Sequence, residues 1–283
     1  MEIRTPGFTE KFTERIKAHV SRINEEVKKE LSRYSWSRFY GPLVYAVEGG
    51  KRIRPLILVL ARETVGNHGA DPWLAAVAVE LLHTESIIHD DIIDEEISRR
   101  ERMAFHIKYG YNASVLTADF VFGMILDIAS RYGDPQVARE LSSAALRMCE
   151  GEFGELKIDP KVHTLTIDEY IQLISEKTAS LFQTSARVGA ILGGGSEREI
   201  DAIGHYGLQL GIAYQIQDDI LDWRNEQKVI GAVISDDASM LDQLRKMARE
   251  YASKAAESLT VSPQSQAKNL LEELADFSVS RKF

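Results

Sequence analysis

Residues 83–100 read HTESIIHDDIIDEEISRR and place three aspartates in an otherwise apolar helical pattern. Asp90 and Asp94 are separated by four positions, so on an α-helix they share one face, with Asp91 beside them. Like charges at this spacing destabilise an isolated helix by about 0.2–0.5 kcal/mol. One interpretation of the motif is a solvated acidic face. The other is a set of carboxylate ligands for a bound cation.

A second copy of the motif favours the cation site. The segment QIQDDILD carries Asp218, Asp219 and Asp222 at the same spacing, again within an apolar run. Two carboxylate clusters on apolar helices, far apart in sequence, suit two walls of one Mg²⁺ site. Mg²⁺ takes one or two carboxylates per ion together with phosphate oxygens and water. The pattern therefore predicts a diphosphate as the remaining ligand.

Length and composition restrict the class of protein. The chain has 283 residues and a net charge of −9. A negative net charge argues against nonspecific binding to nucleic acid. Its one cysteine, Cys149, excludes a disulfide framework and argues against a structural zinc site. The N-terminal residues have no signal-peptide core, and the longest apolar runs are shorter than the roughly 20 residues of a membrane span. We expect a cytoplasmic protein without a transmembrane segment.

Apolar residues recur at helical spacing along almost the whole chain, and no segment alternates as a strand does. Helices are expected near residues 8–32, 35–48, 54–65, 71–96, 112–131, 135–157, 167–192, 197–224, 237–259 and 264–279. No linker or shift in composition divides the chain, so residues 1–283 are predicted to form a single all-α domain. Segments 71–96 and 197–224 are apolar nearly all round, which is typical of central helices.

A glycine-rich basic segment precedes the first acidic helix. Residues 49–55 read GGKRIRP, in which two glycines permit a close approach of the backbone and three cations follow. Such cations can bind an anion. A basic segment of this kind is more often only a helix end exposed to solvent.

Several polar residues near the two acidic motifs are further candidates. His83 lies seven positions before Asp90, about two turns along the same helix face. A histidine at such a position is more often a hydrogen-bonded core residue than a ligand-binding one. The zinc-protease spacing His-Glu-x-x-His is absent around it. Arg99 and Arg100 follow the first motif and either face a diphosphate or offset the neighbouring glutamates.

Two more candidates accompany the second motif. Lys177 is the single cation of an otherwise uncharged helical run that extends to Arg187, so it needs an anionic partner or must reach solvent. Gln215 precedes Asp218 by three positions and places a neutral dipole one turn from the second cluster.

Together these features resemble the trans-isoprenyl (polyprenyl) diphosphate synthase family, from about residue 41 to residue 223. The matching pieces are GGKRIRP (49–55), LLHTESIIHDDIID (81–94), RR (99–100), His106, EKTASLF (176–182) and YQIQDDILD (214–222). Both aspartate motifs with GGKRIRP in this order form a highly specific pattern. The resemblance implies an isoprenoid synthase-like bundle of about ten or more helices around a central cavity, usually as a homodimer. It also implies condensation of isopentenyl diphosphate with an allylic diphosphate (dimethylallyl, geranyl or farnesyl).

The resemblance assigns a role to each matching residue. The residues that would hold isopentenyl diphosphate are Lys51, Arg54, His83 and Arg100. The direct ligands of three Mg²⁺ would be Asp90, Asp94 and Asp218, supported through water by Asp91, Asp219 and Asp222. Arg99 and Lys177 would bind the allylic diphosphate, and the allylic cation would face Thr178, Gln215 and the carbonyl of Lys177.

The sequence departs from the family's pattern in three places. Residues 101–104 read ERMA where the family has Gly-x-Pro-Thr. Ala232 follows Gly231 where a lysine is usual, and the stretch 225–237 is short. Glu85 and Ser86 occupy the positions that limit product length in the family. The small Ser86 predicts a product of C20 or longer, and we expect a partner for Glu85 from residues 112–131 or across a dimer interface.

Two other functions remain open. Asp218, Asp219 and Asp222, with Glu226 four positions on, partly resemble a metal motif of terpene cyclases, although a cyclase needs no isopentenyl site. A non-catalytic partner subunit of a prenyl synthase is the other alternative. Such subunits usually lose one aspartate motif, and this chain keeps both.

Overall fold

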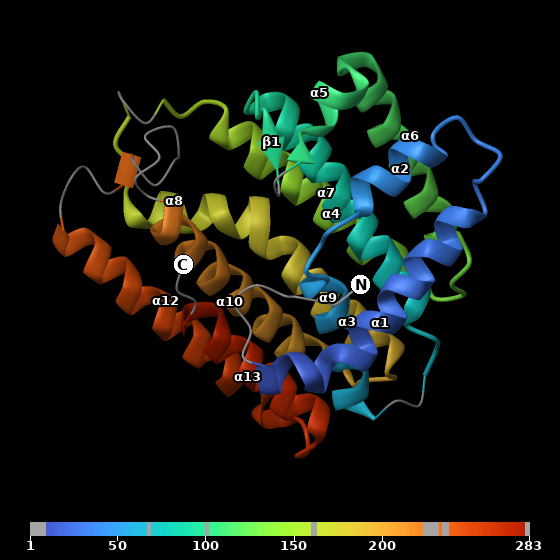
Figure 1. The fold of residues 1–283 in the computed structure, drawn as a ribbon. Helices are drawn as coiled ribbons and strands as arrows, with labels where there is room; N and C mark the ends of the chain where they lie inside the picture. Colours follow the sequence, from blue (N-terminus) through green and yellow to red (C-terminus); the bar gives the residue numbers. More distant parts are fainter. Residues whose placement is uncertain are drawn as a thin grey trace.

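The computed structural model describes residues 10–66, 69–99, 102–159, 163–222, 232–233 and 238–280. The predicted all-α fold is confirmed, and its helices pack around one another without layers of sheet (Figure 1). The helices are α1 (Glu10–Ser32), α2 (Tyr40–Val47), α3 (Ile53–Val65), α4 (Trp73–Ile93), α5 (Phe105–Tyr109), α6 (Tyr111–Ser130), α7 (Pro135–Glu155), α8 (Ile167–Ile174), α9 (Ser180–Leu192), α10 (Glu197–Asp222), α12 (Ala238–Ser258) and α13 (Gln266–Ser280).

The structure differs from the sequence prediction at two places next to the acidic motifs. A short antiparallel pair, β1 (Ser98–Arg99) and β2 (Arg102–Met103), follows α4, whereas no strand was predicted. Two residues per strand are too few to show an alternating pattern. The helix predicted over 167–192 is interrupted by one turn of π-helix, η1 (Ser175–Ala179). Single π turns within α-helices are frequently found at functional sites.

Glycines allow α9 to pack closely against α3 and against α10, the helix that carries the second motif. A Cβ atom on Gly189 of α9 would lie 2.2 Å from the carbonyl oxygen of Leu58 in α3. A Cβ atom on Gly207 of α10 would lie 2.5 Å from the carbonyl oxygen of Phe182 in α9. Any larger residue would therefore separate these backbones. α9 and α10 are buried along most of their length, as predicted for the 197–224 segment.

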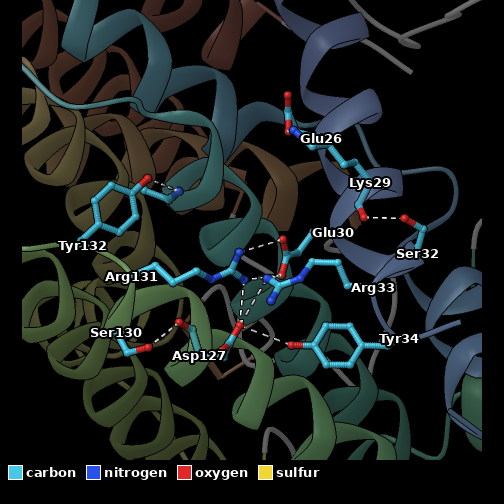
Figure 2. Close-up of polar contacts among 11 residues, drawn as sticks. Glu26, Lys29, Glu30, Ser32, Arg33, Tyr34, Asp127, Ser130, Arg131 and Tyr132 are labelled. Atoms are coloured by element: carbon cyan, nitrogen blue, oxygen red, sulfur yellow. Dashed lines mark hydrogen bonds and ion pairs between the residues drawn. The ribbon is translucent and has the colours of Figure 1, made fainter. Parts of the chain in front are cut away.

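A polar network joins the ends of α1 and α6 (Figure 2). The buried carboxylate of Glu30 accepts hydrogen bonds from Arg131 and, at 2.9 Å, from Arg33. Asp127 lies 2.8 Å from Arg131 and extends the network. Next to it, Tyr132 donates to the carbonyl of Asp71 and accepts from the amide of Ala75 at the start of α4. These contacts hold α1, α4 and α6 together.

α6 combines a buried face with an exposed apolar one. Of the helices in the described ranges, α6 is the one whose length and hydropathy would suffice to cross a membrane, and 44% of that window is buried. A core helix of a soluble protein meets the same criterion, so this is weak evidence. Exposed apolar side chains on α6 and the neighbouring α7 include Tyr111, Leu116, Leu126, Leu146 and Phe153.

Candidate functional site

One cavity of about 780 Å³ collects side chains from both acidic motifs. It lies between α4, α7, the π turn η1 and α10, with one contribution from the start of α3. The predicted site residues that line it are Arg54, His83, Asp90, Asp94, Arg99, Lys177, Thr178, Gln215, Asp218 and Asp219. Residues separated by more than a hundred positions are thus brought to one place, as the paired motifs predict.

The first acidic motif divides between two sides of α4. Asp90 and Asp94 line the cavity, as their spacing of four positions predicts. Asp91 is buried and ion-paired with Arg99 of β1, and it borders a smaller pocket next to α2. α4 ends at Ile93, and Glu95 then adopts a left-handed φ of 52° that turns the chain toward β1.

The cavity raises the pKa of Asp90 to about 7. Burial is the main cause, and the carboxylates of Glu152 and Asp94 add to it, whereas the charges of Lys177 and Arg99 oppose it. Each anion that gathers here increases the cost of ionising the others. A carboxylate destabilised in this way gains from any cation that binds beside it.

Lys177 has two anionic partners on α7. Its ammonium lies 2.7 Å from Glu152 and 2.7 Å from Glu155. Burial lowers the pKa of Lys177, but these carboxylates and Asp90 outweigh it, so the net pKa is raised. The backbones also touch, since a Cβ atom on Gly151 would lie 2.4 Å from the amide nitrogen of Lys177. The predicted need of Lys177 for an anionic partner is met by a helix that the sequence had not connected to it.

The second acidic motif is supported by a chain of hydrogen bonds. Thr178 donates to Gln215 at 3.0 Å, and Gln215 donates to Asp219 at 2.8 Å. The other carboxylate oxygen of Asp219 accepts a hydrogen bond of 2.5 Å from the buried hydroxyl of Tyr170. Asp219 is thereby oriented by protein groups, next to Asp218 on the cavity wall. Tyr170 belongs to none of the sequence motifs, and it joins the site through this hydrogen bond and as a lining residue of the cavity.

At the other end of the cavity, Arg54 and His83 form a pair. Arg54 Nη1 donates to His83 Nε2 at 3.0 Å, which requires the imidazole to carry its proton on Nδ1 if it is neutral. The guanidinium also lies over the ring of Phe182, 4.7 Å from its centroid. Burial lowers the pKa of Arg54. Arg52, counted above among three cations that could bind an anion, is instead buried and ion-paired with Glu80.

Some predicted site residues do not line this cavity in the structure. Lys51 is half-buried in the loop before α3, Asp91 faces Arg99, and Asp222 is exposed at the end of α10. Arg100 lies outside the described residues. So does most of the short stretch 225–237, of which Ala232 and Val233 are described and buried.

Comparison with known proteins identifies the family. The model of the polyprenyl synthetase family matches residues 37–243. The chain belongs to this family. It is 34% identical over 234 residues to the short chain isoprenyl diphosphate synthase of Methanothermobacter thermautotrophicus, covering 81% of this chain and 69% of the relative. Identity to the geranylgeranyl diphosphate synthase of Methanosarcina mazei is 28%, with 95% and 97% covered.

Solved structures agree with this family membership. The crystal structure of geranylgeranyl pyrophosphate synthetase from Pyrococcus horikoshii superposes with a TM-score of 0.85 at 30% identity, covering 96% of this chain and 99% of that one. A decaprenyl diphosphate synthase from Rhodobacter capsulatus also superposes with a TM-score of 0.85, at 25% identity. The chain is an enzyme of the prenyltransferase type with the isoprenoid synthase fold.

The polyprenyl synthetase cavity continues along α4 beyond the aspartates. Glu85 and Ser86 line this part, together with Phe122 of α6 and Met148 and Cys149 of α7. Glu85 is half-buried, and burial raises its pKa. Its ion-pair partner in the structure lies on its own helix and not within residues 112–131, while a partner across a dimer interface stays a prediction. His89 of the same helix lies 3.2 Å away, whereas Asp119 of α6 is a like charge that raises the pKa further.

Proposed function

We propose that the chain is a Mg²⁺-dependent prenyltransferase of the geranylgeranyl diphosphate synthase type. It condenses isopentenyl diphosphate with an allylic diphosphate to make an all-trans prenyl diphosphate of C20 or longer. The observation that carries this proposal is the single cavity, in a member of the polyprenyl synthetase family, that holds carboxylates of both motifs beside Lys177 and the Arg54–His83 pair. Residues 1–283 act as one domain in this proposal.

The donor atoms of the cavity fit Mg²⁺. Asp90, Asp94 and Asp218 offer hard carboxylate oxygens from two facing helices. Within the described parts of the chain, no three His, Cys, Asp or Glu side chains are close enough to hold a metal by themselves. Mg²⁺ takes one or two carboxylates per ion and completes its shell with water and phosphate oxygens, so carboxylates on the two walls can bind ions together with a diphosphate. We expect three ions, which would stabilise the negative charge of a departing diphosphate.

Around the ion site, the chain's own residues would bind and polarise the allylic substrate. Lys177 and Arg99 place positive charge where the diphosphate leaves with the electron pair of the broken C–O bond. The oxygens of Thr178 and Gln215 offer dipoles to the allylic cation that forms. The double bond of isopentenyl diphosphate then forms the new C–C bond. This leaves a tertiary cation, which would lose a proton from the adjacent carbon to the departed diphosphate.

Isopentenyl diphosphate would bind at the opposite end of the cavity. The fixed hydrogen bond between Arg54 and His83 presents two nitrogen groups to an anion. Lys51 lies in the loop before α3, three positions before Arg54, and we assign Arg100 to this half of the site from the family pattern. The two diphosphates are thereby bound by different cations, so substitutions can affect one substrate without the other.

The direct test is incubation of the purified chain with labelled isopentenyl diphosphate and each of three primers: dimethylallyl, geranyl and farnesyl diphosphate. We expect label in prenyl diphosphates of C20 or longer, with Mg²⁺ and not with excess chelator. A terpene cyclase-like enzyme would consume an allylic diphosphate without incorporating label. A non-catalytic subunit would give no product alone and would raise the activity of a second synthase.

We also propose a cytoplasmic homodimer. The exposed apolar side chains of α6 and α7 lie on adjacent helices, and burying them against a second copy would remove a large apolar surface from water. Sedimentation equilibrium of the purified chain tests this proposal, and a monomer at micromolar concentration would contradict it.

A further inference from the structure

Two residue pairs join the start of α3 to α4, one helical turn apart. Arg54 binds His83 at the cavity, and Arg52 binds Glu80 in the interior. Glu80 and His83 are three positions apart on α4 and therefore lie on one face of that helix. The interior pair is 6% and 5% exposed, so it is removed from any substrate.

Arg52 has an unusual backbone conformation. Its φ of 57° and ψ of 31° are left-handed, and it occupies the N-cap position of α3. Among the described non-glycine residues, only Arg52 and Glu95 have positive φ. Such a conformation persists when surrounding contacts hold it, and it is frequently found at functional sites. At this position it sets the direction of Lys51 before the turn and of Arg54 after it.

Three contacts from three other helices hold Arg52. Its guanidinium donates to Asn24 of α1 at 2.9 Å, to the carbonyl of Val47 at the end of α2 at 2.6 Å, and to Glu80 of α4. A planar guanidinium with several donors suits this geometry, and a lysine would not reproduce it.

Gly50 leaves the space that this arrangement needs. A Cβ atom there would lie 2.6 Å from Arg52 Nη1 and 2.8 Å from Glu80 Oε1. The second glycine of GGKRIRP thus leaves room for the buried pair, whereas only the first, Gly49, has a positive φ.

We propose that the Arg52–Glu80 pair positions the isopentenyl diphosphate half of the site. It holds the left-handed turn at Arg52 so that Arg54 meets His83 one turn further along α4, without touching substrate itself. This inference rests on the proposed function for the identity of the ligand. The coupling between the two pairs can be measured without it.

The test uses two variants: one displaces the buried pair and leaves both charges in place, and the other removes one charge and keeps the shape. Gly50→Ala would push the Arg52 guanidinium and the Glu80 carboxylate apart, and Glu80→Gln keeps the shape while removing the charge. Gly41→Ala in α2 is the matched control, because a Cβ atom there has no neighbour within 4 Å. Two quantities are measured for each variant: the KM for each substrate, and the imidazole NMR signals of His83, assigned with a His83→Gln chain.

We expect Gly50→Ala to raise the KM for isopentenyl diphosphate by about tenfold, because a small misplacement of a binding group is costly. The KM for the allylic substrate should stay within about twofold of the parental value, and the His83 signals should shift. Glu80→Gln should change the same two quantities, which covers the case that Gly50→Ala does not fold. Lower resistance to urea with an unchanged KM and unchanged His83 signals would overturn the proposal, because it would show a role in stability alone. A parental chain that makes no product would contradict the proposed function, while the His83 signals would still decide whether the pairs are coupled.

Discussion

The ammonium of Lys177 lies 2.7 Å from a carboxylate oxygen of Glu152, and Glu155 is at the same distance. This arrangement places α7 at the wall of the cavity, although its sequence has neither an aspartate motif nor a basic segment. The lysine lies on a π turn, is held by two glutamates of a neighbouring helix, and is close enough to Asp90 to lower the pKa of that carboxyl. Its charge is therefore held at the cavity wall in a defined direction.

Lys177→Ala is expected to lower kcat by about 10²–10³, the cost of removing one preorganised group that stabilises developing charge. The KM for isopentenyl diphosphate should change little, because Lys177 is assigned to the other substrate. Steady-state kinetics with the two substrates varied separately checks both statements. Lys157→Ala, which removes an exposed lysine just beyond α7, is the control. A variant with the parental kcat and a raised KM for isopentenyl diphosphate would mean that the two diphosphate sites are reversed.

Asp90→Ala and Asp218→Ala are each expected to reduce turnover by several orders of magnitude, because each removes a carboxylate that would bind metal from one wall of the cavity. Asp222→Ala should have a smaller effect, since Asp222 is exposed at the end of α10 and does not line the cavity. Activity measured across a Mg²⁺ titration checks the comparison. Near-parental turnover of either variant at saturating Mg²⁺ would contradict the two-wall arrangement.

The raised pKa of Asp90 predicts how the stability of the metal-free protein depends on pH. The folded pKa is about 7 and the ordinary value is 3.8, so the folded state favours the protonated form. The contribution of Asp90 to stability is therefore complete below about pH 4 and is lost as pH rises through about 7. Asp90→Asn has no such loss and should be more stable than the parental chain at pH 8. Thermal unfolding with chelator at pH 5 and pH 8 measures the difference, and an equal difference at both values would contradict the assignment.

Product length should respond to Glu85 and Ser86. Glu85→Ala removes a carboxylate from the cavity wall and should lengthen the products, whereas Ser86→Phe places a ring beside the growing chain and should shorten them. Chromatography of the dephosphorylated products measures both distributions. An unchanged distribution in Glu85→Ala would place the limit at other lining residues, such as Leu82 or Phe122.

The network of Figure 2 should contribute to stability and not to activity. Arg131→Ala removes one of two cations that bind the buried carboxylate of Glu30 and should cost about 3 kcal/mol of unfolding free energy, as breaking a buried ion pair does. Urea unfolding measures this value. Arg245→Ala removes an exposed pair with Asp242 and should change stability by less than about 0.5 kcal/mol. An equal effect of both substitutions would show that the contacts of Arg131 contribute no more to stability than an exposed ion pair does.

The periodicity of apolar residues predicted the helical class and most helix positions. The residues on the buried face of an α-helix recur every three or four positions, so their pattern is visible in the sequence. The spacing of the aspartates predicted which of them share a face, and Asp90 and Asp94 do line one cavity. These properties are local, so neighbouring residues suffice to determine them. The two motifs in one chain also predicted a shared site, since one cluster alone gives too few ligands.

Tertiary packing decided the properties that depend on residues distant in sequence. Asp91 pairs with Arg99 and does not line the main cavity. Arg52, although part of the basic segment, forms an interior ion pair with Glu80. The spacing of residues in the sequence predicts neither ion pair, because a charged side chain pairs with whichever opposite charge the fold places nearby. Tyr170 entered the site for the same reason, through a hydrogen bond to a residue 49 positions away. The sequence by itself determined which chemical groups the site can use, and the packing of the helices determined which of them face the cavity.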